Sequence, residues 1–183
     1  MLANDFGQFI SRTRYEDLPS AVIDLVKLRV LDLLAAGLAA YSLGCHKHLL
    51  PLLQSTGRAT AWGLGAKLSL RDATLLNTFL AHALYVEDGS RYTGGHPSSV
   101  VIPSAFAIAE TERASGRDLI AAVAVGYEVF LRLGRALYPS LLDRGFQSTA
   151  VIGAAAAAST CANLLHYSPE AAKNALAIAC SRP

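Results

Sequence analysis

Ionisable side chains gather in one short polar stretch of an otherwise apolar sequence. Residues 82–99 read HALYVEDGSRYTGGHPSS and include Glu87, Asp88, Arg91 and His96. An imidazole exchanges protons near neutral pH, and neighbouring charged groups can orient it or bind an anionic substrate. Because polar, glycine-rich interruptions often carry function, we expect acid, base and anion-binding groups to converge on one pocket here.

Two residues of this stretch have alternative interpretations. His96 is either a general acid or base that moves a proton on carbon next to a carboxylate, or a loop histidine hydrogen-bonded to the backbone. Asp88 either orients the imidazole or caps a turn. The helix expected to begin near Ser98 and Ser99 offers backbone N–H groups and a positive dipole end, both of which suit a substrate carboxylate.

The other histidines have simpler explanations. His82 lies among apolar neighbours on an expected helix, which favours a core histidine. His46 and His48 are two residues apart on an expected helix, so they cannot face the same metal ion. His166 follows a helix end, where positive charge is stabilised without a catalytic role. We therefore predict no metal site.

The composition of the chain argues against several function classes. Its 183 residues are 52% hydrophobic and 16% charged, with a formal net charge of +2. Lys and Arg are scattered without a basic run, so we expect no nucleic-acid partner. The three cysteines form no CxxC pair and fit a reducing cytoplasm. We see no signal-peptide pattern and no uninterrupted apolar run of about 18 residues, so we predict a cytoplasmic protein without a membrane partner.

Apolar residues recur at helical spacing along almost the whole chain, which predicts a mostly α fold. Ser69 and Ser168 have the character of N-caps, and Pro169 follows at a first helical position. The expected helices cover residues 19–41, 46–54, 70–85, 98–115, 118–137 and 149–165, and a last one opens at Pro169. Residues 56–67 are expected to form a loop or a short extended piece, and residues 139–145 a turn.

A helix and four segments follow one another in an order that resembles the MmgE/PrpD family of lyases and epimerases. The segments are HALYVEDGSRYTGGHPSS, VVIPSAFAIAE, GRDLIAAVAVGYEVFLRLG and GFQSTAVIGAAAAAS. The resemblance covers nearly the whole chain. The EDGSR spelling is closer to the family branch with a DDGHR-like motif than to a methylcitrate dehydratase.

The resemblance implies an all-α fold in which residues 1–183 form the helical domain of the family, incomplete at the C-terminus and without the α+β domain that normally follows. It also implies a homodimer, no metal or organic cofactor, and a small di- or tricarboxylic acid as substrate. The expected reaction is proton transfer next to a carboxylate, with loss of water or carbon dioxide. If the chain naturally ends here, we expect weak or no lyase activity, because cationic groups of the site would be missing.

Specific residues follow from the matching motifs. His96 of GGHP and Asp88 of the paired acids are predicted to be catalytic. Tyr85 stands where dehydratase and decarboxylase members commonly have aspartate, and Gln147 where the family usually has histidine. Glutamine orients a substrate but cannot exchange a proton, so one acid/base role is expected to be missing. The positions predicted to bind substrate are Tyr85, Glu87, Arg91, Gln147 and Thr149.

Three functions stay open on these grounds. The first is a lyase, the second is an epimerase or racemase that exchanges a proton on two faces of one carbon, and the third is a non-catalytic helical fragment that dimerises. His96 and Asp88 favour an enzyme. The low charge of the chain and Gln147 favour the non-catalytic fragment.

Overall fold

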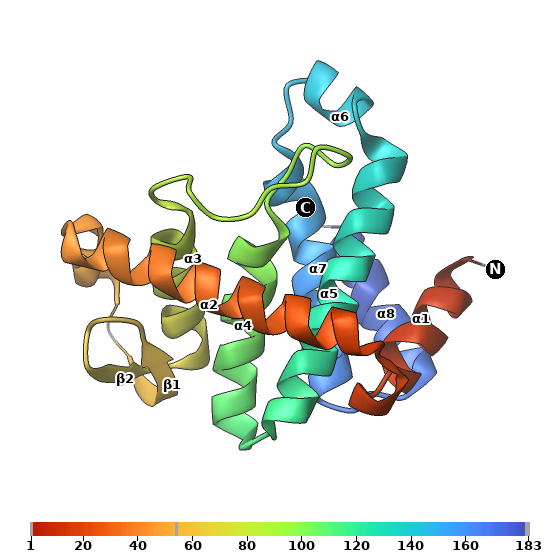
Figure 1. The fold of residues 1–183 in the computed structure, drawn as a ribbon, viewed down its shortest axis with the longest axis horizontal. Coiled ribbons are helices and arrows are strands. Elements are labelled where there is room, and N and C mark those ends of the chain that lie inside the picture. Colours follow the sequence, from red (N-terminus) through yellow and green to blue (C-terminus); the bar gives the residue numbers. More distant parts are fainter. Residues whose placement is uncertain (1, 54, 182–183) are drawn as a thin grey trace.

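The computed structural model describes residues 2–53 and 55–181, and these residues form an almost entirely helical structure (Figure 1). The predicted all-α class is confirmed, with one small hairpin added to it. The helices are α1 (Leu2–Arg12), α2 (Ser20–Ser42), α3 (Leu70–His82), α4 (Pro97–Glu112), α5 (Gly116–Leu137), α6 (Ser140–Asp143), α7 (Ser148–Leu164) and α8 (Pro169–Cys180). The strands are β1 (Thr56–Ala61) and β2 (Ala66–Leu68), and single 3₁₀ turns cover Tyr15–Asp17, Cys45–His48 and Leu50–Leu52.

The predicted N-caps define two helix starts. The Ser69 side chain accepts a hydrogen bond from the Asp72 N–H at the start of α3. The Ser168 side chain accepts one from the Ala171 N–H at the start of α8. Each bond satisfies a backbone donor that the first helical turn leaves unpaired, which is why serine is favoured there.

Several predicted boundaries were wrong. The helix expected over residues 46–54 is instead two 3₁₀ turns, with Gln54 outside the described residues. The helix expected to reach Tyr85 ends at His82, because Tyr85 adopts a φ of 56° that an α-helix cannot contain. The expected turn at 139–145 holds the short helix α6, and α1 was not foreseen. Residues 56–67 do extend, as most of an antiparallel hairpin that pairs Thr60 with Lys67.

The centre of the fold is built from α4, α5 and α7, each packed against the other two. Helix α2 lies across α4 and α5, while α1 and α8 pack together against α7 (Figure 1). Side chains that these helices bury completely include Leu33, Ile102 and Phe130. Among the described residues, no helix combines the length and apolar character needed to cross a membrane.

One end of this bundle carries the polar stretch. The segment between α3 and α4 crosses the end where α4 and α7 begin (Figure 1). It closes on itself through the Ser90 N–H, which donates to the Gly95 carbonyl at 2.9 Å. Gly94 has a φ of 62°, and a Cβ there would lie 2.9 Å from Leu142 and Tyr138 side-chain atoms. Glycine is therefore required at this turn, which delivers His96 to the start of α4.

Candidate active site

His96 is held by its backbone and by one ring nitrogen. It stands at the N-cap of α4, and its N–H donates to the Thr149 hydroxyl at 2.9 Å. Its Nδ1 lies 2.9 Å from the Asp88 carbonyl oxygen. Because a carbonyl only accepts, this bond assigns the proton of a neutral ring to Nδ1 and leaves the Nε2 lone pair free. With 22% of its side chain exposed, His96 is accessible to a small molecule.

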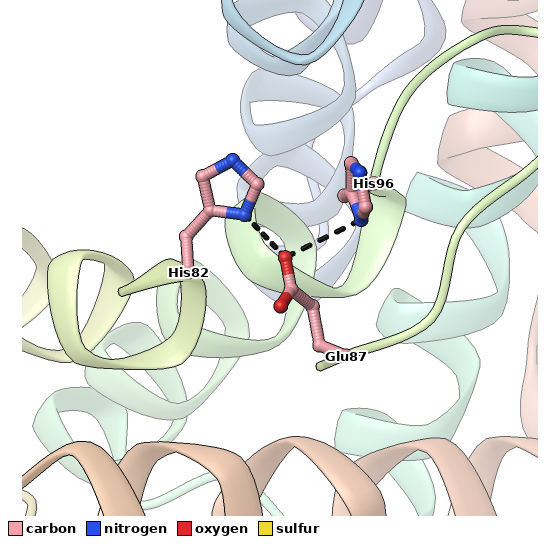
Figure 2. Close-up of side chains that lie close together, drawn as sticks. All are labelled: His82, Glu87 and His96. Carbon is pink, nitrogen blue, oxygen red and sulfur yellow. Dashed lines mark hydrogen bonds and ion pairs between the residues drawn. The ribbon is translucent and has the colours of Figure 1, made fainter. Parts of the chain in front are cut away.

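Glu87 is a buried carboxylate between two histidines (Figure 2). Its Oε1 contacts His82 Nδ1 and lies 3.4 Å from His96 Nδ1. The Glu87 side chain has no exposed surface. Its Oε2 is buried and has no hydrogen-bond partner among the described residues. A carboxylate taken out of water needs compensating charge or hydrogen bonds, so the two imidazoles are central to its stability.

His82 belongs to this cluster, which corrects its interpretation as a core histidine. It is the last residue of α3, and 26% of its side chain is exposed. Its ring centroid lies 5.1 Å from that of His96 and 4.4 Å from that of Tyr85. The sequence contained one usable signal, since a histidine at a helix end and a carboxylate five residues later are joined by a chain short enough to turn back.

Asp88 organises the site through its carbonyl and its carboxylate. Its Oδ1 accepts the Ser98 N–H at 3.2 Å, and its Oδ2 accepts the Tyr127 hydroxyl at 3.1 Å and lies 3.7 Å from Arg29 Nε. Burial and the neighbouring Asp88 charge raise the pKa of Tyr127, which keeps that hydroxyl protonated as a donor. The Ser98 N–H, expected to be open to a substrate, is thus already paired. In the part of the chain that the structure describes, the contact between Asp88 and the His96 ring is the one from the Asp88 carbonyl to Nδ1.

Tyr85 and Gln147, the two departures from the family pattern, lie against each other. The Gln147 amide donates to the Tyr85 hydroxyl at 3.2 Å, although 62 residues separate them. Gln147 is the N-cap of α7 and accepts the Thr149 N–H. The Tyr85 ring in turn lies 5.1 Å from the His96 ring. An uncharged pair, Tyr85 and Gln147, therefore stands beside the histidines at the two positions where the family pattern has an aspartate and a histidine.

Arg91 lies elsewhere. It lines a cavity of about 700 Å³ together with Arg29, Tyr92 and apolar residues of α2 and α5. Asp88 also borders that cavity, and neither His82 nor His96 is among the described residues that line it. Among the described residues, no hydrogen bond or ion pair joins Arg91 to either histidine. Of the predicted residues, the structure thus brings together Tyr85, Glu87, Asp88, His96, Gln147 and Thr149.

The same cluster has the composition of a metal centre. His82, Glu87 and His96 offer ligand atoms that lie within 4.8 Å of one another. Two histidines and a glutamate form a ligand set known from catalytic zinc sites. The hydrogen bond to the Asp88 carbonyl assigns a proton to His96 Nδ1, so this ring could ligate a metal only through Nε2. The observed contacts are those of a hydrogen-bonded cluster, and the prediction that no metal binds stays a prediction.

Comparison with known proteins decides the family. The model of the MmgE/PrpD N-terminal domain matches residues 4–183. The chain belongs to the MmgE/PrpD family. As an MmgE/PrpD domain, it is 30% identical to cis-aconitate decarboxylase of Aspergillus terreus, over 99% of its own length and 39% of the relative.

Two further relatives agree. The chain is 29% identical to cis-aconitate decarboxylase-like protein oryM of Aspergillus oryzae, over 95% of this chain and 38% of that protein. It is 28% identical to cis-aconitate decarboxylase of Homo sapiens, over 98% of this chain and 39% of that protein. This MmgE/PrpD chain therefore spans about two fifths of the length of the curated relatives it matches.

Proposed function

We propose that this MmgE/PrpD chain supplies the acid/base site of a lyase that acts on a small di- or tricarboxylic acid. The observation that carries the proposal is the setting of His96. Its Nδ1 is bonded to the Asp88 carbonyl and its N–H to Thr149, so a partly exposed ring presents Nε2 in a fixed orientation. A base fixed by such contacts is suited to moving a proton at carbon.

The proposed chemistry is proton transfer next to a carboxylate. In decarboxylation, the electrons of the broken C–C bond enter the unsaturated carbon framework, carbon dioxide leaves, and protonated His96 gives its Nε2 proton to carbon. In dehydration, neutral His96 takes the C–H proton while the C–O bond breaks, and the hydroxyl leaves as water after accepting a proton from solvent. The curated relatives are named for decarboxylation of cis-aconitate, so decarboxylation of an unsaturated tricarboxylic acid is the first candidate.

The neutral pair beside His96 supports a carboxylate-binding role for that side of the site. Both Tyr85 and Gln147 are exposed, and the tyrosine hydroxyl and the glutamine amide are hydrogen-bond donors. Such donors can hydrogen-bond to the carboxylate of a substrate. They are uncharged, so they do not repel that carboxylate as an aspartate would. A Gln147 amide exchanges no proton, so the proton transfer is assigned to the histidines.

A second candidate is an epimerase, and one observation favours it. Two imidazoles with centroids 5.1 Å apart give the site two groups that can exchange protons. An epimerase removes and returns the proton on one carbon, so it changes configuration without releasing carbon dioxide or water. The products of the two reactions therefore distinguish the candidates directly.

We also propose a homodimer formed through α2. Leu25, Leu28 and Leu31 are 54%, 61% and 66% exposed on this helix, which is an unusual amount of apolar surface for one element. Light scattering coupled to size exclusion measures the mass. A monomer at micromolar concentration would contradict the dimer.

The proposed function is tested by incubating the purified chain in deuterated buffer with cis-aconitate, citrate and aspartate. Proton NMR follows loss of C–H signals and formation of products, and a ¹³C-carboxyl label follows carbon dioxide. We expect deuterium incorporation with at least one acid, and release of carbon dioxide with cis-aconitate. No exchange and no product with any of these acids would overturn the proposal.

A further inference from the structure

The two imidazoles on Glu87 point to a second acid/base group in the site. We propose that His82 and His96 form a proton-transfer pair and that Glu87 is the positioning residue for both rings. The inference rests on the proposed function, because it concerns the same reaction. It adds a residue that the motif comparison did not assign, at a position where the sequence favoured a core histidine.

The hydrogen bonds give both rings the same tautomer. His96 Nδ1 lies 2.9 Å from the Asp88 carbonyl and 3.4 Å from Glu87 Oε1, and His82 Nδ1 contacts that same oxygen. A carbonyl and an ionised carboxylate only accept, so each neutral ring carries its proton on Nδ1. Figure 2 shows the other nitrogen of each ring pointing away from Glu87. Both Nε2 atoms are therefore left for chemistry.

Charge balance gives the pair one extra proton. Glu87 has no exposed side-chain surface, and Oε2 has no partner among the described residues. A cation beside this buried carboxylate stabilises it, and an imidazolium at His82 or His96 provides that charge. Two imidazolium rings side by side would repel each other. The proposal therefore assigns the acid role to one ring and the base role to the other, side by side on one carboxylate.

The exchange step then needs no further residue. Neutral His96 takes the proton from carbon at Nε2, and the electrons of the C–H bond move towards the adjacent carboxylate. Protonated His82 donates its Nε2–H to that carboxylate, where negative charge develops. On reversal, carbon regains a proton from His96, and deuterium enters when the ring proton has exchanged with solvent. The Gln147 amide beside them exchanges no proton, so the second role falls to His82.

The first readout does not depend on turnover. Long-range ¹H–¹⁵N NMR reports which nitrogen of each histidine carries the proton. We expect His82 and His96 to show protonated Nδ1, and Glu87→Gln to shift the ¹⁵N signals of both rings while the exposed His48 stays unchanged. If Glu87→Gln left the signals of either ring unchanged, the shared carboxylate would be disproved, whether or not the chain turns over any acid.

The second readout is the exchange reaction. His82→Asn is expected to slow deuterium exchange by about 10²-fold, the size of a lost general acid, while His48→Asn stays at the wild-type rate. Equal exchange in His82→Asn and wild type would overturn the pair but leave the role of His96 intact. Absence of exchange in wild type would instead overturn the proposed function. Exchange that EDTA abolishes and Zn²⁺ restores would reassign the cluster to a divalent cation and also overturn the pair.

Discussion

Thr149→Val removes the hydroxyl that holds the His96 backbone while keeping the shape of the side chain. Thr149 is 6% exposed, and its Oγ1 accepts the His96 N–H at 2.9 Å. Leaving such a buried donor without a partner costs about 1 to 3 kcal/mol. The new methyl is buried and recovers about 0.8 kcal/mol, so we expect a net loss of about 0.2 to 2.2 kcal/mol. At about 2 to 4 °C per kcal/mol for a chain of this size, the Tm falls by up to about 9 °C.

The neighbouring residue provides a matched control. Ser148 is also buried on the same helix, but its hydroxyl has no hydrogen-bond partner among the described residues. Ser148→Ala should therefore leave the Tm unchanged or raise it slightly, because a hydroxyl buried without a partner is unfavourable. Differential scanning calorimetry measures both variants. Equal Tm changes for Thr149→Val and Ser148→Ala would refute the argument that the contact to His96 stabilises the fold.

Three other predictions concern packing and charge. Gly126→Ala places a Cβ 2.0 Å from Thr160 Oγ1, whereas the Cβ of Gly116→Ala meets nothing within 4 Å. Urea unfolding should show that the free energy of unfolding falls by about 1 to 3 kcal/mol in Gly126→Ala and changes little in Gly116→Ala. Equal losses in the two variants would contradict this packing. Burial raises the pKa of Cys161 to about 11, so iodoacetamide at pH 8 should label this thiol only after unfolding. Mass spectrometry measures the labelling, and rapid labelling of Cys161 in the folded protein would contradict the prediction. Burial alone would raise the pKa of Glu110, but hydrogen bonds from β1 hold it below its usual 4.5; its stabilisation is therefore present at neutral pH and is lost as the pH falls through the lowered pKa. Glu110→Gln should be less stable than wild type at pH 7, and the difference should shrink on acidification; a difference that stays constant down to about pH 2 would contradict it.

Local signals in the sequence predicted where two of the helices begin. The N-caps Ser69 and Ser168 act within three residues of themselves, so the start of α3 and of α8 could be read directly. The end of α3 could not be read from the sequence in this way. It is set by Tyr85, which takes a positive φ without being glycine, and no local rule for tyrosine predicts that conformation. This one turn brings Glu87 back to His82.

The candidate site was only partly predictable for the same reason. The polar stretch identified His96, Asp88 and Glu87, because they are close in sequence. The partners that fix them come from distant helices: the Tyr127 hydroxyl reaches Asp88 across 39 residues and Thr149 reaches the His96 backbone across 53. Such contacts follow from how α4, α5 and α7 pack, and single-sequence patterns carry no information about them.

Chemical rescue tests the central role of His96 most directly. His96→Gly removes the imidazole at a helix N-cap, a position where glycine is well tolerated, and leaves space for a free imidazole to enter. We predict that the variant loses deuterium exchange on the responsive carboxylic acid and regains it in proportion to added imidazole. Wild-type exchange in His96→Gly without imidazole would contradict the assignment of His96 as the group that moves the proton.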